Sequence, residues 1–252
     1  MASIERTAYP RFKQNPLAKE LDALYTPTDD ELSFANALAR KAQPRFGFLL
    51  LLKSFQRLGY FPSMEGIPPA IVQHVRTASG IDAEVSPNYA ELRTLYRHHQ
   101  AIRERLGVSA WGEDGLRVAS EAMSTAAKVM DNPADLINVA IEELVRQRIE
   151  LPAFSSLDRL SRRIRTLING RFFARVMERL SETERGKLDA LLEIGNSPQK
   201  KTLFFALKQL PKRSSLGHLQ DLLDHIVKLS DTVCRRAFKN TQPCALNFTQ
   251  GL

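Results

Sequence analysis

Cysteine is scarce in this sequence, and long apolar runs are absent. Of 252 residues only Cys234 and Cys244 are cysteines, too few for a disulfide framework or a zinc site, so a reducing, cytoplasmic setting is expected. The longest apolar run, FGFLLLL at 46–52, has seven residues, whereas a membrane span needs about 20. The first residues, MASIERTAYPRF, contain no apolar segment of a signal peptide. We therefore expect no membrane partner and predict a core helix at 46–52.

The sequence also lacks the motifs of common catalytic sites. It has no glycine-rich phosphate-binding loop and no nucleophile elbow. His218 and His225 are close to one helix face, but no cysteine or carboxylate stands beside them at zinc-ligand spacing. His74 is expected to be a half-buried helix residue. We predict no catalytic residue, no metal ligand and no cofactor, and hence no enzyme activity in this chain.

What the chain does have is an ordinary apolar content and an excess of positive charge. Apolar residues make up 43% and charged residues 25%, values typical of a folded globular protein. Lysine and arginine total 36 against 28 acids, which gives a net charge of +8 and a pI near 9.7. This balance favours a polyanionic partner without identifying it.

Helix signals dominate the chain, and strand signals are nearly absent, so the predicted fold class is all-α and multi-helical. Capping boxes at Thr28 and Ser181 predict helix starts, Pro44 is expected to end one helix, Gly59 to close the next, and Ser86 to cap a later one. The expected helices lie at about 16–25, 29–42, 45–58, 68–80, 88–106, 113–130, 133–148, 156–180, 182–195, 202–210 and 215–230.

The predicted domain organisation has two helical DNA-binding units. Residues 1–26 form an N-terminal arm with a short helix, and residues 27–150 form the first unit. Residues 151–235 form the second unit, and the tail at 236–252 lacks helical periodicity. The helix at 133–148, a short turn with Pro152 and the following helix have the order of a helix-turn-helix-like element.

Residues 151–171, LPAFSSLDRLSRRIRTLINGR, concentrate basic charge on a helix start. Leu157, Leu160, Ile164, Leu167 and Ile168 follow helical spacing and are expected to face the core. Ser155 and Ser156 would lie at the N-terminal end, where either can cap the helix and where anions are attracted. The basic residues fall off the apolar stripe and are predicted to contact DNA: Arg159, Arg162, Arg163, Arg165 and Arg171.

A solvated helix face is the alternative interpretation of these arginines. From 159 to 179 there are seven basic residues and one acid, a local net charge of +6. A helix that is merely solvated more often alternates the two signs to form pairs one turn apart, so this imbalance favours an anionic partner.

Two further basic groups precede that stretch. Arg45, Lys53 and Arg57 form one, and Arg93, Arg97, His98, His99 and Arg103 form the other. In the second group Arg93, Arg97 and the neighbourhood of Gln100 share a helix face that is interleaved with Tyr89 and Tyr96, a mixture suited to phosphate and sugar contacts. The alternative places the tyrosines in the core and the arginines in water.

Four stretches, in the same order, resemble the N-terminal region of replicative transposases of the Tn-three family. The opening arm ERTAYPRF with PLAKELDALYTPTDDELSFA is one. The others are RFGFLLLLKSFQRLGYF with IPPAIVQHV at 45–75, NYAELRTLYRHHQAIRERLG at 88–107, and LINVAIEELVRQRIELPAFSSLDRLSRRIR at 136–165.

The resemblance implies a helical region that binds double-stranded DNA at the terminal inverted repeats of a transposon in a bacterial, nucleoid-associated setting. By position, Arg45 matches the family's Arg-x-Gly segment. Arg93, His98 and Arg103 match its basic helix, and Ser155, Ser156, Arg159 and Leu160 match its Leu-Pro-x-x-(Ser/Thr)-(Ser/Thr)-Leu-x-Arg-Leu segment.

The same resemblance brings a departure and leaves alternatives. Family transposases are far longer, and the acidic triad of their ribonuclease-H-like domain has no counterpart here, so strand transfer is not expected of this chain. A non-enzymatic helical module that contacts other transposase subunits is the alternative function. RNA binding is less favoured, because no stacking platform of exposed aromatic residues is evident.

Overall fold

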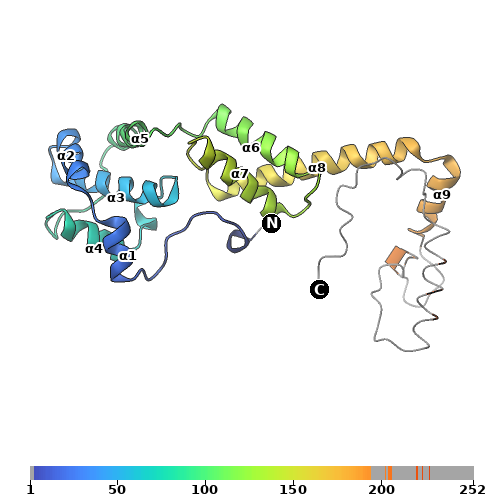
Figure 1. Cartoon of the computed structure of the whole chain (residues 1–252), viewed down its shortest axis with the longest axis horizontal. Coiled ribbons are helices and arrows are strands. Elements are labelled where there is room, and N and C mark those ends of the chain that lie inside the picture. Colours follow the sequence, from blue (N-terminus) through green and yellow to red (C-terminus); the bar gives the residue numbers. More distant parts are fainter. Residues whose placement is uncertain are drawn as a thin grey trace. The chain divides into compact units, whose positions relative to one another are not determined.

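The computed structural model describes residues 3–193 and, beyond them, residues 202, 204, 205, 220, 223 and 227. The predicted all-α class is confirmed, because the elements of the described residues are helices, and residues 109 and 149 form an isolated bridge outside them (Figure 1). The α-helices are α1 (Ala18–Tyr25), α2 (Asp29–Leu38), α3 (Ala42–Leu58), α4 (Pro69–Ala78), α5 (Leu92–Leu106), α6 (Glu113–Ala126), α7 (Pro133–Arg146), α8 (Phe154–Arg179) and α9 (Glu182–Ala190).

Local capping signals set several of these boundaries as predicted. The Glu31 amide donates to Thr28 Oγ1 at 3.3 Å and the Thr28 amide to Glu31 Oε2 at 2.9 Å, which completes the capping box of α2. Ser181 and Glu184 repeat the arrangement at the start of α9. Gly59 closes α3 with φ of 72°, a conformation that costs other residues more than glycine.

Other predicted boundaries were wrong. Helix α2 ends at Leu38, and Pro44 lies in the first turn of α3, where its missing amide hydrogen costs no intrahelical bond. Helix α5 begins at Leu92, with Glu91 as its N-cap residue, whereas Ser86 Oγ accepts from the Asn88 amide at 3.4 Å and caps no helix. Helix α8 begins at Phe154, so the two serines predicted to cap it lie inside its first turn.

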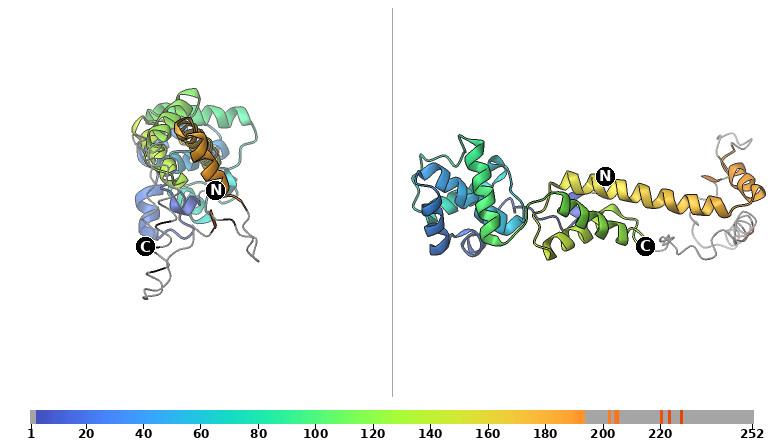
Figure 2. Two further views of the ribbon diagram at one scale, coloured as in Figure 1. Left: turned by 90° about the vertical axis from the view of Figure 1, so that its right-hand side faces the viewer. Right: turned by 90° about the horizontal axis from the view of Figure 1, so that it is seen from above.

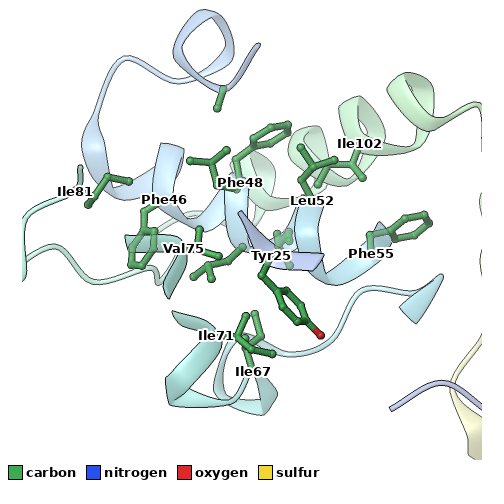
Figure 3. Close-up of a cluster of buried hydrophobic side chains, with 14 residues drawn as sticks. Tyr25, Phe46, Phe48, Leu52, Phe55, Ile67, Ile71, Val75, Ile81 and Ile102 are labelled. Carbon is green, nitrogen blue, oxygen red and sulfur yellow. The ribbon is translucent and has the colours of Figure 1, made fainter. Parts of the chain in front are cut away.

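The main core is built around α3, as the run at 46–52 predicted. Every residue from Phe46 to Leu52 is buried, and Figure 3 shows their neighbours Ile67, Ile71 and Val75 on one side and Ile102 on another. Helices α1, α2, α4 and α5 surround α3, whose apolar character on all sides is that of a buried helix.

The chain divides into two compact units, residues 1–165 and residues 166–252, with the division inside α8. The turn at 150–153, where we predicted a boundary, lies within the first unit. There the Leu151 amide donates to the Gly59 carbonyl at 2.8 Å, and Tyr9 Oη donates to the Pro152 carbonyl at 2.8 Å. The right-hand view of Figure 2 shows the first half of α8 beside α7.

In the second unit a small cluster forms from Val176 and Leu180 with Phe172 and Leu188. The predicted helices at 202–210 and 215–230, the tail at 236–252 and the pair His218 and His225 lie outside the described residues except at isolated positions. None of the helices described in the chain is both long and apolar enough to cross a bilayer.

Candidate nucleic-acid interface

The first half of α8 buries only part of the predicted apolar stripe, together with two polar residues. Leu157 and Ile164 are buried, whereas Leu160 is half-buried and Leu167 is 51% exposed. Asp158 and Ser161 complete the buried face. Ser161 Oγ donates to the Asp158 carbonyl at 2.9 Å, which satisfies its hydroxyl without a partner on another element.

Two of the predicted DNA-contacting arginines of α8 are held by acids. Arg162 Nη2 lies 2.8 Å from Asp158 Oδ2, one turn earlier on the same helix. Arg165 donates through Nε and Nη2 to the two carboxylate oxygens of Asp131, at 2.7 and 2.8 Å. A guanidinium that already donates two hydrogen bonds to one carboxylate has fewer N–H donors left for a phosphate.

In the first unit, two other arginines of α8 are exposed and make no ion pair or side-chain hydrogen bond with any residue that the structure describes: Arg159 and Arg163. Together with the exposed Ser156 they follow i, i+3, i+7 spacing and so share one helix face. We call Ser156, Arg159 and Arg163 the α8 face. Ser155 is exposed in the same first turn, and Arg171 is exposed in the second unit.

Helix α5 carries a second exposed face of related composition. Arg93, Tyr96, Arg97 and Gln100 are all exposed, Tyr96 by 64%, and follow i, i+3, i+4, i+7 spacing. We call these four residues the α5 face. The two arginines make no ion pair within the described part of the chain, so they are free to meet an anion. Of the two predicted environments for the tyrosines, Tyr96 lies outside and Tyr89 packs inward.

His98 lies on the opposite side of α5 and is fully buried. Its Nδ1 is 2.7 Å from Tyr89 Oη, and its ring stands edge-on to Phe48 with centroids 5.2 Å apart. Burial lowers the pKa of His98 to about 4, and the Arg97 charge contributes to the shift, so the ring is neutral near pH 7. We withdraw His98 from the predicted DNA contacts, because a buried neutral ring offers nothing to a phosphate.

The basic residues of α3 also serve the fold. Lys53 is buried, and its Nζ lies 3.2 Å from Glu31 Oε2, whose other oxygen accepts from Gln56 Nε2 at 2.7 Å. We withdraw Lys53 as well, since an unpaired Glu31 in the core would be costly. Arg45 is half-buried and donates to Asn36 Oδ1 at 2.9 Å, while Arg57 is exposed.

The glycine of the Arg-x-Gly segment has a packing role. A Cβ atom on Gly47 would lie 2.7 Å from Tyr89 Cε2 and 2.8 Å from the Pro87 carbonyl oxygen. Only a residue without a side chain therefore lets the 87–89 segment pack against α3.

An open groove of about 690 Å³ lies in the first unit and is lined by one residue of each arginine face. Tyr96 of the α5 face and Ser156 of the α8 face both line it. Its walls are rich in rings, and we call it the aromatic groove: Tyr9, Tyr60, Phe61, Tyr96, Trp111 and Phe154.

Arg103, predicted to contact DNA, lies in this groove. Its Nη1 is 3.0 Å from Glu150 Oε2, and its guanidinium carbon is 5.6 Å from the centre of the Phe61 ring. The same Phe61 ring also stacks with the His99 ring, with centroids 3.8 Å apart and planes 7° apart. No local sequence pattern predicts the groove, because its rings come from segments far apart along the chain.

No group of three or more potential metal ligands occurs among the residues that the structure describes.

Comparison with known proteins places the first unit in a family. Residues 1–164 match the model of DUF4158, described as a domain of unknown function, and this range nearly coincides with the compact unit 1–165.

The chain is also similar to curated transposases. It is 27% identical over 212 residues to the transposase for transposon Tn501 of Pseudomonas aeruginosa, which covers 83% of this chain and 21% of the relative. The transposase for transposon Tn3926 of Escherichia coli gives the same values. The transposase for transposon Tn1546 of Enterococcus faecium is 22% identical over 198 residues, or 77% of this chain and 20% of the relative. The chain thus spans about a fifth of the length of these relatives, and the predicted homology to Tn-three family transposases is confirmed.

Proposed function

The chain belongs to the DUF4158 family, and we propose that it binds double-stranded DNA at the terminal inverted repeats of a transposon. It would do so as the N-terminal part of a Tn-three family transposase, in the bacterial cytoplasm and in association with the nucleoid. We attribute binding alone to these residues and no strand transfer.

The observation that carries the proposal is the pairing state of the arginines. Arg159 and Arg163 on α8, and Arg93 and Arg97 on α5, are exposed without an acid partner in the described chain. Neutralising phosphates releases condensed counterions, which supplies most of the affinity of proteins for DNA. Four free arginines on two helix faces that border one groove form a surface suited to a phosphate backbone.

Helix α8 is the better candidate for reading bases. Its first turn presents two exposed serines at the helix N-terminus, which suit a phosphate there. Arg159, in the second turn, would then reach a base edge in the major groove. The connection from α7 to α8 covers residues 147–153, longer than the three or four residues of a helix-turn-helix, so we propose a helix-turn-helix-like element with an extended turn.

The test is a salt series with matched variants. Anisotropy titrations would compare a duplex carrying a transposon inverted repeat with a scrambled duplex of the same composition. Four phosphate contacts predict a slope of log affinity against log salt of roughly −3 to −4. Removing either arginine pair, Arg93→Ala with Arg97→Ala or Arg159→Ala with Arg163→Ala, should make the slope shallower by about 2.

The control removes the same charge elsewhere. Arg117 and Arg146 are exposed on α6 and α7, where Asp114, Glu121 and Glu143 already pair with them. The double variant Arg117→Ala with Arg146→Ala should keep the wild-type slope. Equal losses in all three double variants would mean that only total charge matters, and equal affinity for the two duplexes would remove the claim of specificity.

A protein-interaction module is the second candidate, and the far half of α8 favours it. Leu167, Phe173 and Met177 are 51%, 60% and 45% exposed there. Apolar side chains gathered on one helix suit contact with another transposase subunit. Absence of DNA binding at low salt, together with concentration-dependent association lost in Phe173→Ser, would favour this function.

A further inference from the structure

The aromatic groove contains more than rings. The guanidinium of Arg103 and the carboxylate of Glu150 lie side by side in it, 3.0 Å apart and 22% and 16% exposed. Burial raises the pKa of Glu150, while Arg103 and the Trp111 backbone act in the opposite direction. Ring faces next to one fixed donor and one fixed acceptor are what a planar, hydrogen-bonding aromatic ligand needs.

The groove adjoins both arginine faces, and this position favours a ligand that is part of a polyanion. Its lining includes Tyr96, which belongs to the α5 face, and Ser156, which belongs to the α8 face. A polyanion held by both sets of free arginines would therefore lie over the groove mouth. The group that such a polyanion could insert is the one it carries every few ångströms, a nucleobase.

We propose that the aromatic groove takes up one unstacked base of the bound DNA. This inference rests on the proposed function and adds a deformation of the duplex to it. Proteins that extrude a base bind it by stacking on aromatic side chains and by hydrogen bonds to its edge. Here Tyr96 and Trp111 supply ring faces, and the pair Arg103 and Glu150 supplies a donor and an acceptor.

An apolar peptide is a poorer occupant of the same space. It could contact the rings, but it would offer no aromatic hydrogen-bonding edge to Arg103 and Glu150, and it would gain nothing from the arginines of the α5 and α8 faces. The volume of about 690 Å³ is within the usual range of small-molecule sites, about 300 to 1,000 Å³.

One glycine fixes the wall of the groove that Trp111 forms. A Cβ atom on Gly115 would lie 2.6 Å from Cε3 of the Trp111 ring. Gly115→Ala should therefore displace the indole while leaving the arginines of both faces unchanged. Trp111 is also the only tryptophan of the chain, so its fluorescence reports on this groove alone.

The experiment compares three duplexes of one sequence: fully paired, carrying one extra unpaired adenine, and carrying an abasic residue at the place of that adenine. An unpaired base has already lost its partner, so the groove should bind it at little unstacking cost. The adenine-bulged duplex should bind roughly tenfold more tightly than the paired one and should quench Trp111 emission, in keeping with base–aromatic stacking. The abasic duplex should do neither.

Variants separate the groove from the arginine faces. Trp111→Ala and Gly115→Ala should each reduce the preference for the bulge to less than about twofold, with melting curves run beside them to detect unfolding. Arg159→Ala with Arg163→Ala should weaken all three duplexes alike and keep the preference. A preference retained in both groove variants would overturn the proposal.

The remaining outcomes distinguish this proposal from the function it rests on. Equal affinity for the three duplexes with unchanged Trp111 emission overturns the groove proposal and leaves DNA binding standing. Failure to bind any duplex overturns the proposed function; quenching of Trp111 by deoxyadenosine monophosphate would then still support a base site, and no quenching would overturn that as well. Emission that changes with protein concentration alone would assign the groove to a second copy of the chain and overturn the proposal.

Discussion

Arg165 holds Asp131 through two hydrogen bonds, from Nε at 2.7 Å and from Nη2 at 2.8 Å, across 34 residues of sequence. Arg163, two residues earlier on the same helix, is exposed and has no such partner among the described residues. The two arginines occupy similar sequence surroundings. Arg165 nevertheless pairs α8 with the segment just before α7, whereas Arg163 is available to a ligand.

This difference predicts that one substitution affects DNA binding and the other affects stability. Arg163→Ala should weaken binding to every duplex by a similar factor and make the salt slope shallower by about 1, without changing the melting temperature. Arg165→Ala should lower the free energy of unfolding by about 0.5 to 1 kcal/mol, because the pair is partly exposed and is screened by solvent. Anisotropy titrations and thermal melts of the two proteins make the comparison. A larger loss of DNA affinity in Arg165→Ala than in Arg163→Ala would contradict it.

Arg159→Ala should behave differently from both. If its guanidinium reads a base edge, the substitution should cost about 1 to 3 kcal/mol on the cognate duplex and relax the preference at one base pair. Binding to a panel of single-base variants of the repeat would show this. Uniform weakening across the panel would instead assign Arg159 to a phosphate.

A leucine series along α8 tests which face is buried. Leu157→Ala should lower the free energy of unfolding by about 2 to 5 kcal/mol, because Leu157 is fully buried. Leu160→Ala should lower the free energy of unfolding by less than Leu157→Ala does, because Leu160 is half-buried. Leu167→Ala should change the free energy of unfolding by less than about 0.5 kcal/mol, since Leu167 is 51% exposed. Urea unfolding measures all three. A larger cost at Leu160 than at Leu157 would contradict this order of burial.

Local sequence signals predicted helix ends correctly where the residues that form the cap lie within four positions of each other. The capping boxes at Thr28 and Ser181 and the left-handed Gly59 are of this kind. Periodicity correctly predicted that Leu157 and Ile164 of α8 are buried, but it also placed the exposed Leu167 in the buried stripe. The buried Asp158 pairs with Arg162, and the buried Ser161 donates to the backbone, and hydrophobic spacing contains no information on such polar partners.

The candidate site could be predicted only in part, for a related reason. The density of arginines marked α5 and α8, but which of them are free depends on acids elsewhere in the chain, such as Asp131 and Glu150. His98 looked like part of a basic helix face until its contact with Tyr89 placed it in the core. Pairings between distant segments arise from the fold, so the sequence could identify the helices but not their free side chains.

Two helical glycines provide a matched stability test. Gly47→Ala should destabilise the protein by about 1 to 3 kcal/mol, because the new methyl group would meet Tyr89 and the Pro87 carbonyl at less than 3 Å. Gly170→Ala, in α8, meets nothing within 4 Å and should stabilise its helix by up to about 1 kcal/mol through helix propensity. Chemical unfolding of both variants decides the matter. Equal effects would show that the close approach of the 87–89 segment to α3 is absent in solution.

Acid should destabilise the first unit through two adjacent histidines of α5. Burial lowers the pKa of His98 to about 4, with Arg97 contributing, and burial lowers the pKa of His99 to about 4, with Arg103 and His98 contributing. An unfolded histidine has a pKa near 6.5, so between about pH 6.5 and pH 4 the unfolded chain binds protons that the folded chain does not. Stability is therefore fully present above pH 6.5 and is lost as the pH falls toward 4, by about 1 to 3 kcal/mol for the fully buried His98.

The sharpest measurement is the slope of the free energy of unfolding between pH 5 and pH 7, a window above the range in which most carboxylates titrate. His98→Asn can keep a hydrogen bond to Tyr89 but cannot take up a proton, so it should flatten this slope by up to about 1.4 kcal/mol per pH unit. His99→Phe should flatten it in the same direction while keeping the stacking on Phe61. Proton titration of the two rings by NMR gives an independent reading. A wild-type protein equally stable at pH 5 and pH 7, or a His98→Asn protein with the wild-type slope, would mean that His98 is not held neutral in the core.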